Sequence, residues 1–274
     1  MDKKHLRWVD LHLRDLTLGD VNRDAIDLLT KKRLEDGVSH ATVNRMLEVV
    51  RAILRRAERE WEWIEKAPYI RMLPEPKRRV RWLKREEAMR LIDCSPKHLK
   101  GLIRFSLATG LRKSNVTGLT WQQVDLERRV AWIHADQAKA GRSINVPLND
   151  DALDVLNSQI GKHPEYVFVY RGKPLQETNT KAWKNALKRA GIQNFRWHDL
   201  RHTWASWHVQ GGTPLAVLQE LGGWESSEMV RRYAHLGCEH TAVYANQISL
   251  QPRKKAEIGT NLVQNRNGRL LRVV

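Results

Sequence analysis

Four side chains in the C-terminal third of the sequence have the chemical types needed to bind a phosphate and attack it. His198 and Arg201 are three residues apart, so on a helix they would share one face and reach the same phosphodiester. Trp224 follows the pair Gly222 and Gly223, and Tyr233 comes shortly afterwards. An imidazole and a guanidinium bind phosphate oxygens, an indole donates a hydrogen bond, and a phenol serves as a nucleophile. This stretch predicts phosphate chemistry.

Short helices should position these groups. Gly211 and Gly212 are expected to end the helix that carries His198 and Arg201, and Thr213 with Pro214 has the pattern of an N-cap followed by a proline in the first helical position. Trp224 then falls in a loop. Ser226 or Ser227 is a candidate cap for a last short helix carrying Tyr233.

Two upstream segments supply further basic groups. In residues 108–114, a helix should end at Gly110 and Arg112 should stand at the start of the next short helix. Residues 130–134 and 143–147 are β-like runs that flank a turn containing Gly141, which predicts a β-hairpin with Lys139 at or near its tip.

Taken in order, these four segments resemble the tyrosine recombinase (phage integrase) family. The resemblance covers nearly the whole chain beyond about residue 16. It implies a mainly α fold with a small antiparallel β-sheet, in which a helical core-binding domain precedes an α+β catalytic domain. It also implies a site-specific DNA recombinase that cleaves and rejoins strands through a 3′-phosphotyrosyl intermediate, in integration or excision of a mobile element or phage.

The resemblance assigns a role to each group. Tyr233 would be the nucleophile, and Arg112 and Arg201 would hold the two non-bridging oxygens of the phosphate. His198 would either bind the phosphate or help to take the tyrosine proton. Trp224 would donate its indole N–H to a phosphate oxygen and pack beside the nucleophile, although a role in the core is the alternative for this residue.

Lys139 would protonate the departing 5′ oxygen, with Lys113 and Arg142 as rivals for that role. Where the family usually has an acidic residue after its first arginine, this chain has Asn115, which supplies no countercharge. Asp199 and His202 are expected to support the neighbouring catalytic pair. Only two cysteines are present, and no metal-binding spacing of histidines appears, so we expect neither a metal nor another cofactor.

Composition favours a polyanionic partner. Lys and Arg number 48 against 31 Asp and Glu, which gives a formal charge of +17, and the pI is near 10.2. Double-stranded DNA is the partner that this charge and the resemblance predict, bound by four copies on two recombination sites, with accessory DNA-bending proteins as possible partners. No apolar segment follows the polar N-terminus, so we expect a cytoplasmic protein without a membrane anchor.

Prolines and a basic run divide the chain into expected domains. We expect a core-binding domain at residues 1–74, a basic linker at 75–81, a catalytic domain at 82–249 and a C-terminal tail at 250–274. The first domain looks shortened at its start and leaves no room for a separate arm-binding domain. A long amphipathic helix from Ser39 to about Trp63 has a basic face that could follow a DNA backbone or simply be solvated. The candidate DNA-binding residues are Arg45, Arg51, Arg55, Arg59, Arg78 and Arg79.

Two other functions fit the same residues. A type IB topoisomerase would use the same nucleophile to relax supercoils without pairing two sites. A DNA-binding regulator that has lost catalysis would explain the departure at Asn115, but the complete set of phosphate-handling residues favours an enzyme.

Overall fold

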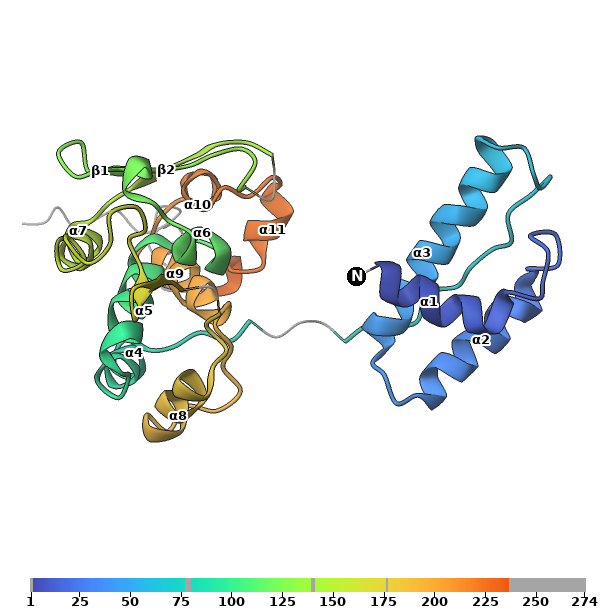
Figure 1. The fold of residues 1–274 in the computed structure, drawn as a ribbon, viewed down its shortest axis with the longest axis horizontal. Helices are drawn as coiled ribbons and strands as arrows, with labels where there is room; N and C mark the ends of the chain where they lie inside the picture. Colours follow the sequence, from blue (N-terminus) through green and yellow to red (C-terminus); the bar gives the residue numbers. More distant parts are fainter. Residues whose placement is uncertain (1, 77–79, 139–140, 176, 237–274) are drawn as a thin grey trace, which may run out of the picture. The chain divides into compact units, whose positions relative to one another are not determined.

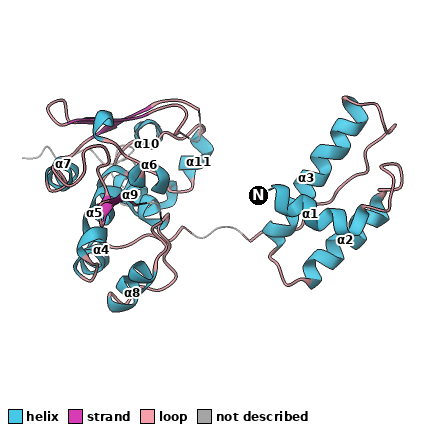
Figure 2. Cartoon of the chain, in the orientation of Figure 1, coloured by secondary structure: helices cyan, strands magenta, loops and turns pink. Residues whose placement is uncertain are grey.

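The computed structural model describes residues 2–76, 80–138, 141–175 and 177–236. The chain divides into two compact units, Met1–Arg79 and Val80–Val274 (Figure 1). Helices dominate both units, and the few strands are short and antiparallel (Figure 2). This confirms the predicted fold class.

The first unit consists of three helices, α1 (Asp2–Leu13), α2 (Arg23–Glu35) and α3 (His40–Arg59). The predicted cap at Ser39 is confirmed, because its hydroxyl accepts a hydrogen bond from the Thr42 N–H. Helix α3 ends before the expected Trp63, since Glu62 adopts a positive φ of 54° and the Trp63 N–H donates back to the Ala57 carbonyl. Helix α1 was not expected, because its apolar residues are too few to give a clear period. The apolar side chains of α3 form most of the core of this unit: Val43, Met46, Leu47, Val50 and Leu54.

The proline-containing segment after α3 is bound to the first unit. The Asn44 side chain, which is buried in α3, accepts a hydrogen bond from the Leu73 N–H and donates to the Leu73 carbonyl and to Glu75. His40 contacts the Pro74 carbonyl at 2.8 Å. Since Asn44 pairs with backbone groups that no secondary structure satisfies, it holds this extended segment against the helix.

The second unit is built around helix α9 (Asp199–Gln210), which packs against α5 (Lys97–Thr109) and α10 (Leu215–Gly222) (Figure 1). Eight of its residues are buried, so it has no wide polar face and shows little amphipathic pattern. The remaining elements of the unit are α4 (Arg85–Asp93), α6 (Lys113–Thr117), η1 (Trp121–Gln123), α7 (Asp150–Asn157), α8 (Lys181–Arg189), α11 (Ser227–Arg231) and η2 (Ala234–Leu236).

Two small antiparallel sheets complete the second unit. The first has the order β1 (Val124–Asp125), β2 (Val130–Ile133) and β3 (Ile144–Pro147). Strands β2 and β3 pair from Val130 opposite Pro147 to Ile133 opposite Ile144, which confirms the predicted hairpin. The second sheet pairs β4 (Val169–Tyr170) with β5 (Lys173–Pro174). Among the described residues, no helix is long and apolar enough to cross a bilayer.

Candidate active site

The Arg201 side chain is buried on α9 and is held by three groups from two segments. Its two terminal nitrogens donate to the carbonyls of Gly110 at 2.7 Å and of Gly222 at 2.5 Å. Its guanidinium lies over the ring of Trp224, 4.2 Å from the ring centroid. Two hydrogen bonds and a cation–π contact fix the plane of the guanidinium, so its position is set before any ligand binds.

Glycine is required where these carbonyls approach Arg201. Gly110 ends α5 with φ +64°, and a β-carbon there would lie closer than 3.0 Å to ring atoms of Trp204. A β-carbon on Gly222 would collide in the same way with the ring of Trp224. The predicted end of the helix at Gly110 is confirmed, but the use of both carbonyls to hold an arginine was missed. The sequence signal is only that a glycine stands at each position.

Tyr233 is buried, with 1% of its surface exposed, and its hydroxyl lies 2.6 Å from Nδ1 of His202. Its ring packs beside Trp224, with 5.9 Å between ring centroids. The residue follows α11 and precedes η2, so the expectation that the last short helix carries Tyr233 is wrong. Helix α11 ends at Arg231, two residues before Tyr233, because the chain tightens here, with the Tyr233 N–H donating to the Val230 carbonyl.

His198 forms the N-cap of α9 and is exposed. Its ring stands edge-on to the ring of His202, with 5.0 Å between the ring centroids. Partial desolvation and then the charge of Arg201 lower the pKa of His198, while Asp199 acts in the opposite direction. In the part of the chain that the structure describes, we find no side-chain hydrogen bond from His198, so its ring nitrogens are available to a ligand.

Arg112 forms the N-cap of α6, and its terminal nitrogen Nη1 is buried without a hydrogen-bond partner among the described residues. Burial lowers the pKa of Arg112. Asn115, one turn further along α6, also has an unpaired buried nitrogen, Nδ2. Unpaired buried donors are costly, which favours an acceptor arriving from outside the chain.

Burial opposes charge on every ionisable group at the centre of this cluster. Desolvation, followed by the positive charge of Arg112, lowers the pKa of Arg201 to about 9. Desolvation raises the pKa of Tyr233 to about 12 and lowers the pKa of His202 to about 4. At neutral pH the phenol and the His202 imidazole are therefore neutral, while both guanidinium groups keep their charge. The cluster carries two neighbouring cations that an oxyanion between them would stabilise.

The structure brings together five of the six residues predicted for catalysis, and Trp224 also belongs to a buried cluster with Trp204, as the alternative interpretation predicted. Lys139 lies outside the described residues, as do Arg78 and Arg79. Lys113, a rival of Lys139 for the role of acid, forms an exposed ion pair with Glu177 at 3.3 Å. The other rival, Arg142, is exposed.

The two residues expected to support the pair have different contacts. The buried carboxylate of Asp199 accepts hydrogen bonds from the Arg196 N–H and guanidinium, so it fixes the start of α9. His202 has its side-chain hydrogen bond with Tyr233, and its ring also lies edge-on to that of His198.

The basic face of α3 contains paired and unpaired arginines. Arg45 and Arg59 lie within ion-pair distance of Glu48 and Glu58, at 2.5 Å and 3.9 Å. Within the described ranges, Arg51 and Arg55 have no carboxylate partner and are one helical turn apart. These two are the better placed to contact phosphates.

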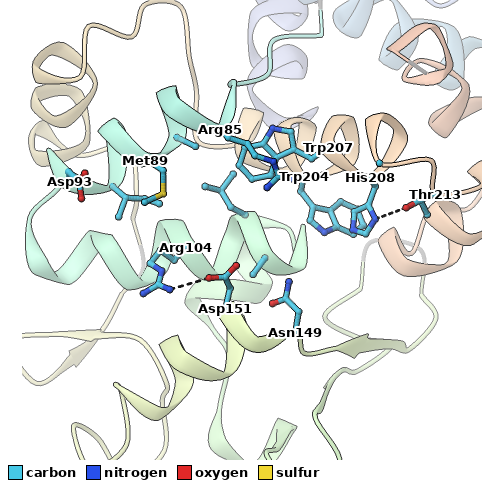
Figure 3. A pocket seen from close by; sticks show the side chains of 15 residues that line it. Arg85, Met89, Asp93, Arg104, Asn149, Asp151, Trp204, Trp207, His208 and Thr213 are labelled. Carbon is cyan, nitrogen blue, oxygen red and sulfur yellow. Dashed lines mark hydrogen bonds and ion pairs between the residues drawn. The ribbon is translucent and has the colours of Figure 1, made fainter. Parts of the chain in front are cut away.

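A separate cavity of about 740 Å³ lies between α4, α5, α7 and α9 of the second unit (Figure 3). Its walls carry the ion pair Arg104–Asp151 and the hydrogen bond between His208 and Thr213. Trp204 is shared with the cluster around Tyr233, but none of the six residues predicted for catalysis lines the cavity. The cavity is therefore distinct from the cluster of predicted catalytic residues.

Comparison with known proteins now adds to this geometry. The model of the phage integrase family matches residues 81–240, which include the whole cluster. The chain belongs to the phage integrase family. The integrase of Salmonella phage P22 is 52% identical over 222 residues, covering 76% of this chain and 57% of that protein. The shufflon-specific DNA recombinase of Escherichia coli is 28% identical over 230 residues, covering 81% of this chain and 56% of that protein. This integrase-family chain thus spans a little more than half the length of these relatives.

Solved structures share its fold. An integrase of the transposon Tn1549, in complex with a circular intermediate DNA, matches with a TM-score of 0.75 at 17% identity, covering 90% of this chain and 94% of that one. A lambda integrase dimer bound to a COC′ core site matches with a TM-score of 0.68 at 20% identity, covering 85% of this chain and 86% of that one. The family model thus establishes the family, and the solved structures establish the fold.

Proposed function

We propose that this chain is a site-specific DNA recombinase that cuts and reseals DNA through a tyrosine ester. The observation that carries the proposal is the cluster in which Arg112 and Tyr233 both lie close enough to Arg201 to act on its charge, with no acceptor of the chain found for Arg112 Nη1 among the described residues. In this reaction the phenolic oxygen attacks phosphorus, a 3′-phosphotyrosyl bond forms, and the bond to the 5′ oxygen breaks. The ester conserves the energy of the broken bond, so resealing needs no ATP.

The arginines would act on the charge of the transition state. Charge develops on the two non-bridging oxygens as phosphorus becomes five-coordinate, and Arg112 and Arg201 would hold those oxygens. Removal of one such preorganised donor typically slows a reaction about 10²- to 10³-fold. His198 would bind the same phosphate from the start of α9, Trp224 would donate its indole N–H, and Lys139 would protonate the departing 5′ oxygen.

The partner would be double-stranded DNA. The chain carries a formal charge of +17, and Arg51 and Arg55 on α3 have no carboxylate partner in the part of the chain that the structure describes. The related lambda integrase was solved as a dimer on a core site, and the Tn1549 integrase on a circular intermediate DNA. By analogy, we infer four copies on two recombination sites in the cytoplasm, with integration or excision of a mobile element as the outcome.

We also infer a division of labour along the chain. Residues 1–74 would grip the duplex, residues 82–249 would carry the chemistry, and the basic segment 75–81 would join them, followed by a tail at 250–274. This assignment is supported because the basic residues of α3 belong to the first unit and the cluster around Arg201 belongs to the second.

The test is a covalent adduct that survives denaturant. A library of randomised duplexes, each nicked so that the short cleaved fragment diffuses away, is incubated with the full chain, and DNA that stays bound under denaturing conditions is sequenced. Wild type should form the adduct on a common sequence, Tyr233→Phe should not, and the exposed Tyr170→Phe should behave as wild type. An adduct in Tyr233→Phe would reject the nucleophile. Relaxation of supercoils without joining of two recovered sites would indicate a topoisomerase, and DNA binding without any adduct would indicate a regulator.

A further inference from the structure

The hydroxyl of Tyr233 has one polar partner in the described part of the chain, and that partner is His202. The distance from the hydroxyl to Nδ1 of His202 is 2.6 Å, which is a short hydrogen bond. The ring centroids of Tyr233 and His202 lie 5.8 Å apart, and the centroid of the tilted Trp224 ring lies 5.9 Å from that of Tyr233. Since only 1% of Tyr233 is exposed, bulk water does not compete for its proton.

The two histidines of α9 have different surroundings. His198 is exposed at the N-cap and stands edge-on to His202, whereas His202 is half-buried and reaches the nucleophile. A base must lie within hydrogen-bond reach of the proton it takes. His202 satisfies that condition, and no hydrogen bond joins His198 to Tyr233 in the described residues.

We propose that His202 is a catalytic residue that takes the proton of Tyr233 as the DNA strand is cut and returns it when the strand is resealed. This inference rests on the proposed function. In the forward step the phenolic O–H bond breaks, its electron pair forms the bond to phosphorus, and the proton moves to Nδ1 of His202. The bond from phosphorus to the 5′ oxygen breaks with its electrons, and that oxygen takes a proton from a separate acid. Resealing reverses each transfer.

Both groups start in the neutral form from which a proton transfer during attack begins. His202 is neutral at neutral pH because burial lowers its pKa to about 4, so one ring nitrogen offers a lone pair. Burial also raises the pKa of Tyr233 to about 12, so only about one phenol in 10⁵ is ionised at pH 7. Attack by a preformed phenolate is therefore rare, and transfer during attack avoids that limit. The other charged or titratable groups that act on this pair are His198, Asp199, Arg196, Arg201 and Arg232.

The test replaces the base and keeps a hydrogen-bonding group in its place. In His202→Asn the amide occupies the position of Nδ1, but it cannot accept a proton at neutral pH. The matched control is His208→Asn, since His208 is a second half-buried histidine of α9 whose Nδ1 contacts the hydroxyl of Thr213 at 3.0 Å. Adduct formation by the full chain is timed on a duplex recovered from the library described above, made with either oxygen or sulfur as the bridging 5′ atom. A sulfur leaving group needs no acid, so the second substrate isolates activation of the nucleophile.

We expect His202→Asn to form the adduct about 10²-fold or more slowly than wild type on both substrates. On the sulfur substrate, the wild-type rate should be flat between pH 6 and 9, whereas the variant rate should rise about tenfold per pH unit as the phenol ionises. His208→Asn should follow wild type. Equal DNA affinity and equal thermal stability of the two variants would exclude misfolding as the cause of the difference.

Three outcomes would overturn the inference. They are an unchanged rate in His202→Asn, a slow rate that sulfur restores, and a slow rate with the flat pH profile of wild type. In each of these, an adduct that still requires Tyr233 would leave the proposed function standing. A Tyr233-independent adduct, or none with wild type, would reject the proposed function itself.

Discussion

Replacing Gly110 with alanine should destabilise the second unit far more than the same change at another left-handed glycine. Gly110 has φ +64°, and a β-carbon there would meet three ring atoms of Trp204 at less than 3.0 Å. The backbone conformation alone costs an alanine roughly 1–2 kcal/mol. Overpacking against a buried ring adds roughly 1–3 kcal/mol. Gly110→Ala should therefore lower the free energy of unfolding by about 2–5 kcal/mol.

Gly191→Ala is the matched control. Gly191 also follows a helix in the same unit, at φ +68°, but a β-carbon there would have no atom within 4 Å. Its cost should be only that of the backbone, roughly 1–2 kcal/mol. The remaining difference of about 2 kcal/mol should appear as a gap of about 4–8 °C in melting temperature, measured by calorimetry on the full chain.

Gly110→Ala should also slow adduct formation, because the Gly110 carbonyl accepts a hydrogen bond from Arg201 at 2.7 Å. Gly191→Ala should leave that rate unchanged. Equal melting temperatures for the two variants would show that Trp204 yields without cost, and would refute the close packing on which the position of Arg201 depends.

Three further predictions follow from the same structure. Trp224→Ala should destabilise the protein by roughly 3–5 kcal/mol in urea unfolding. Trp224→Phe keeps a ring face for the Arg201 guanidinium and should destabilise the protein clearly less. Similar losses for the two variants would argue against the cation–π contact between Arg201 and Trp224. Because the pKa of His202 falls to about 4 on folding, the unfolded chain binds its proton first as the pH drops, so stability present above pH 6.5 is lost towards pH 4. The pKa shift sets an upper limit of about 3 kcal/mol for this loss, and the actual loss should be smaller because the ring is partly exposed. In urea unfolding, the stability of His202→Asn should decline less steeply with falling pH than that of wild type. An identical decline would contradict the pKa shift. The double change Arg51→Gln and Arg55→Gln should reduce the log–log salt slope of DNA binding by about 0.9 for each phosphate that is no longer neutralised. The control Arg23→Gln removes a charge near Asp27 and should leave the slope unchanged. An unchanged slope in the double variant would show that α3 does not contact DNA.

Much of the local structure follows from the sequence because its signals are local. Ser39 caps α3, Gly110 ends α5, and the alternating runs around Gly141 form a hairpin, since each depends on residues close in the chain. Helix α1 was missed because its stability comes from packing on α3, an interaction that no local pattern shows.

The site was predictable by residue type but not by the partners of each side chain. Arg201 and Tyr233 were expected from their spacing and from the family resemblance. Their partners lie far away in the sequence: Gly110 is 91 residues from Arg201, and His202 is 31 residues from Tyr233. The choice between His198 and His202 depends on which imidazole the folded chain turns towards the phenol, and this is decided by tertiary packing.

The close approach of Gly223 to Ile144 has a mechanical consequence. Gly223 lies against the side chain of Ile144 on β3, so closely that a β-carbon could not be accommodated, and it directly precedes Trp224, whose ring covers Arg201. The hairpin and the guanidinium are therefore linked through only three side chains or backbone units. Motion of the hairpin on meeting a ligand would therefore shift the Arg201 guanidinium. A substitution at Ile144, remote from any reacting atom, would change the position of Arg201.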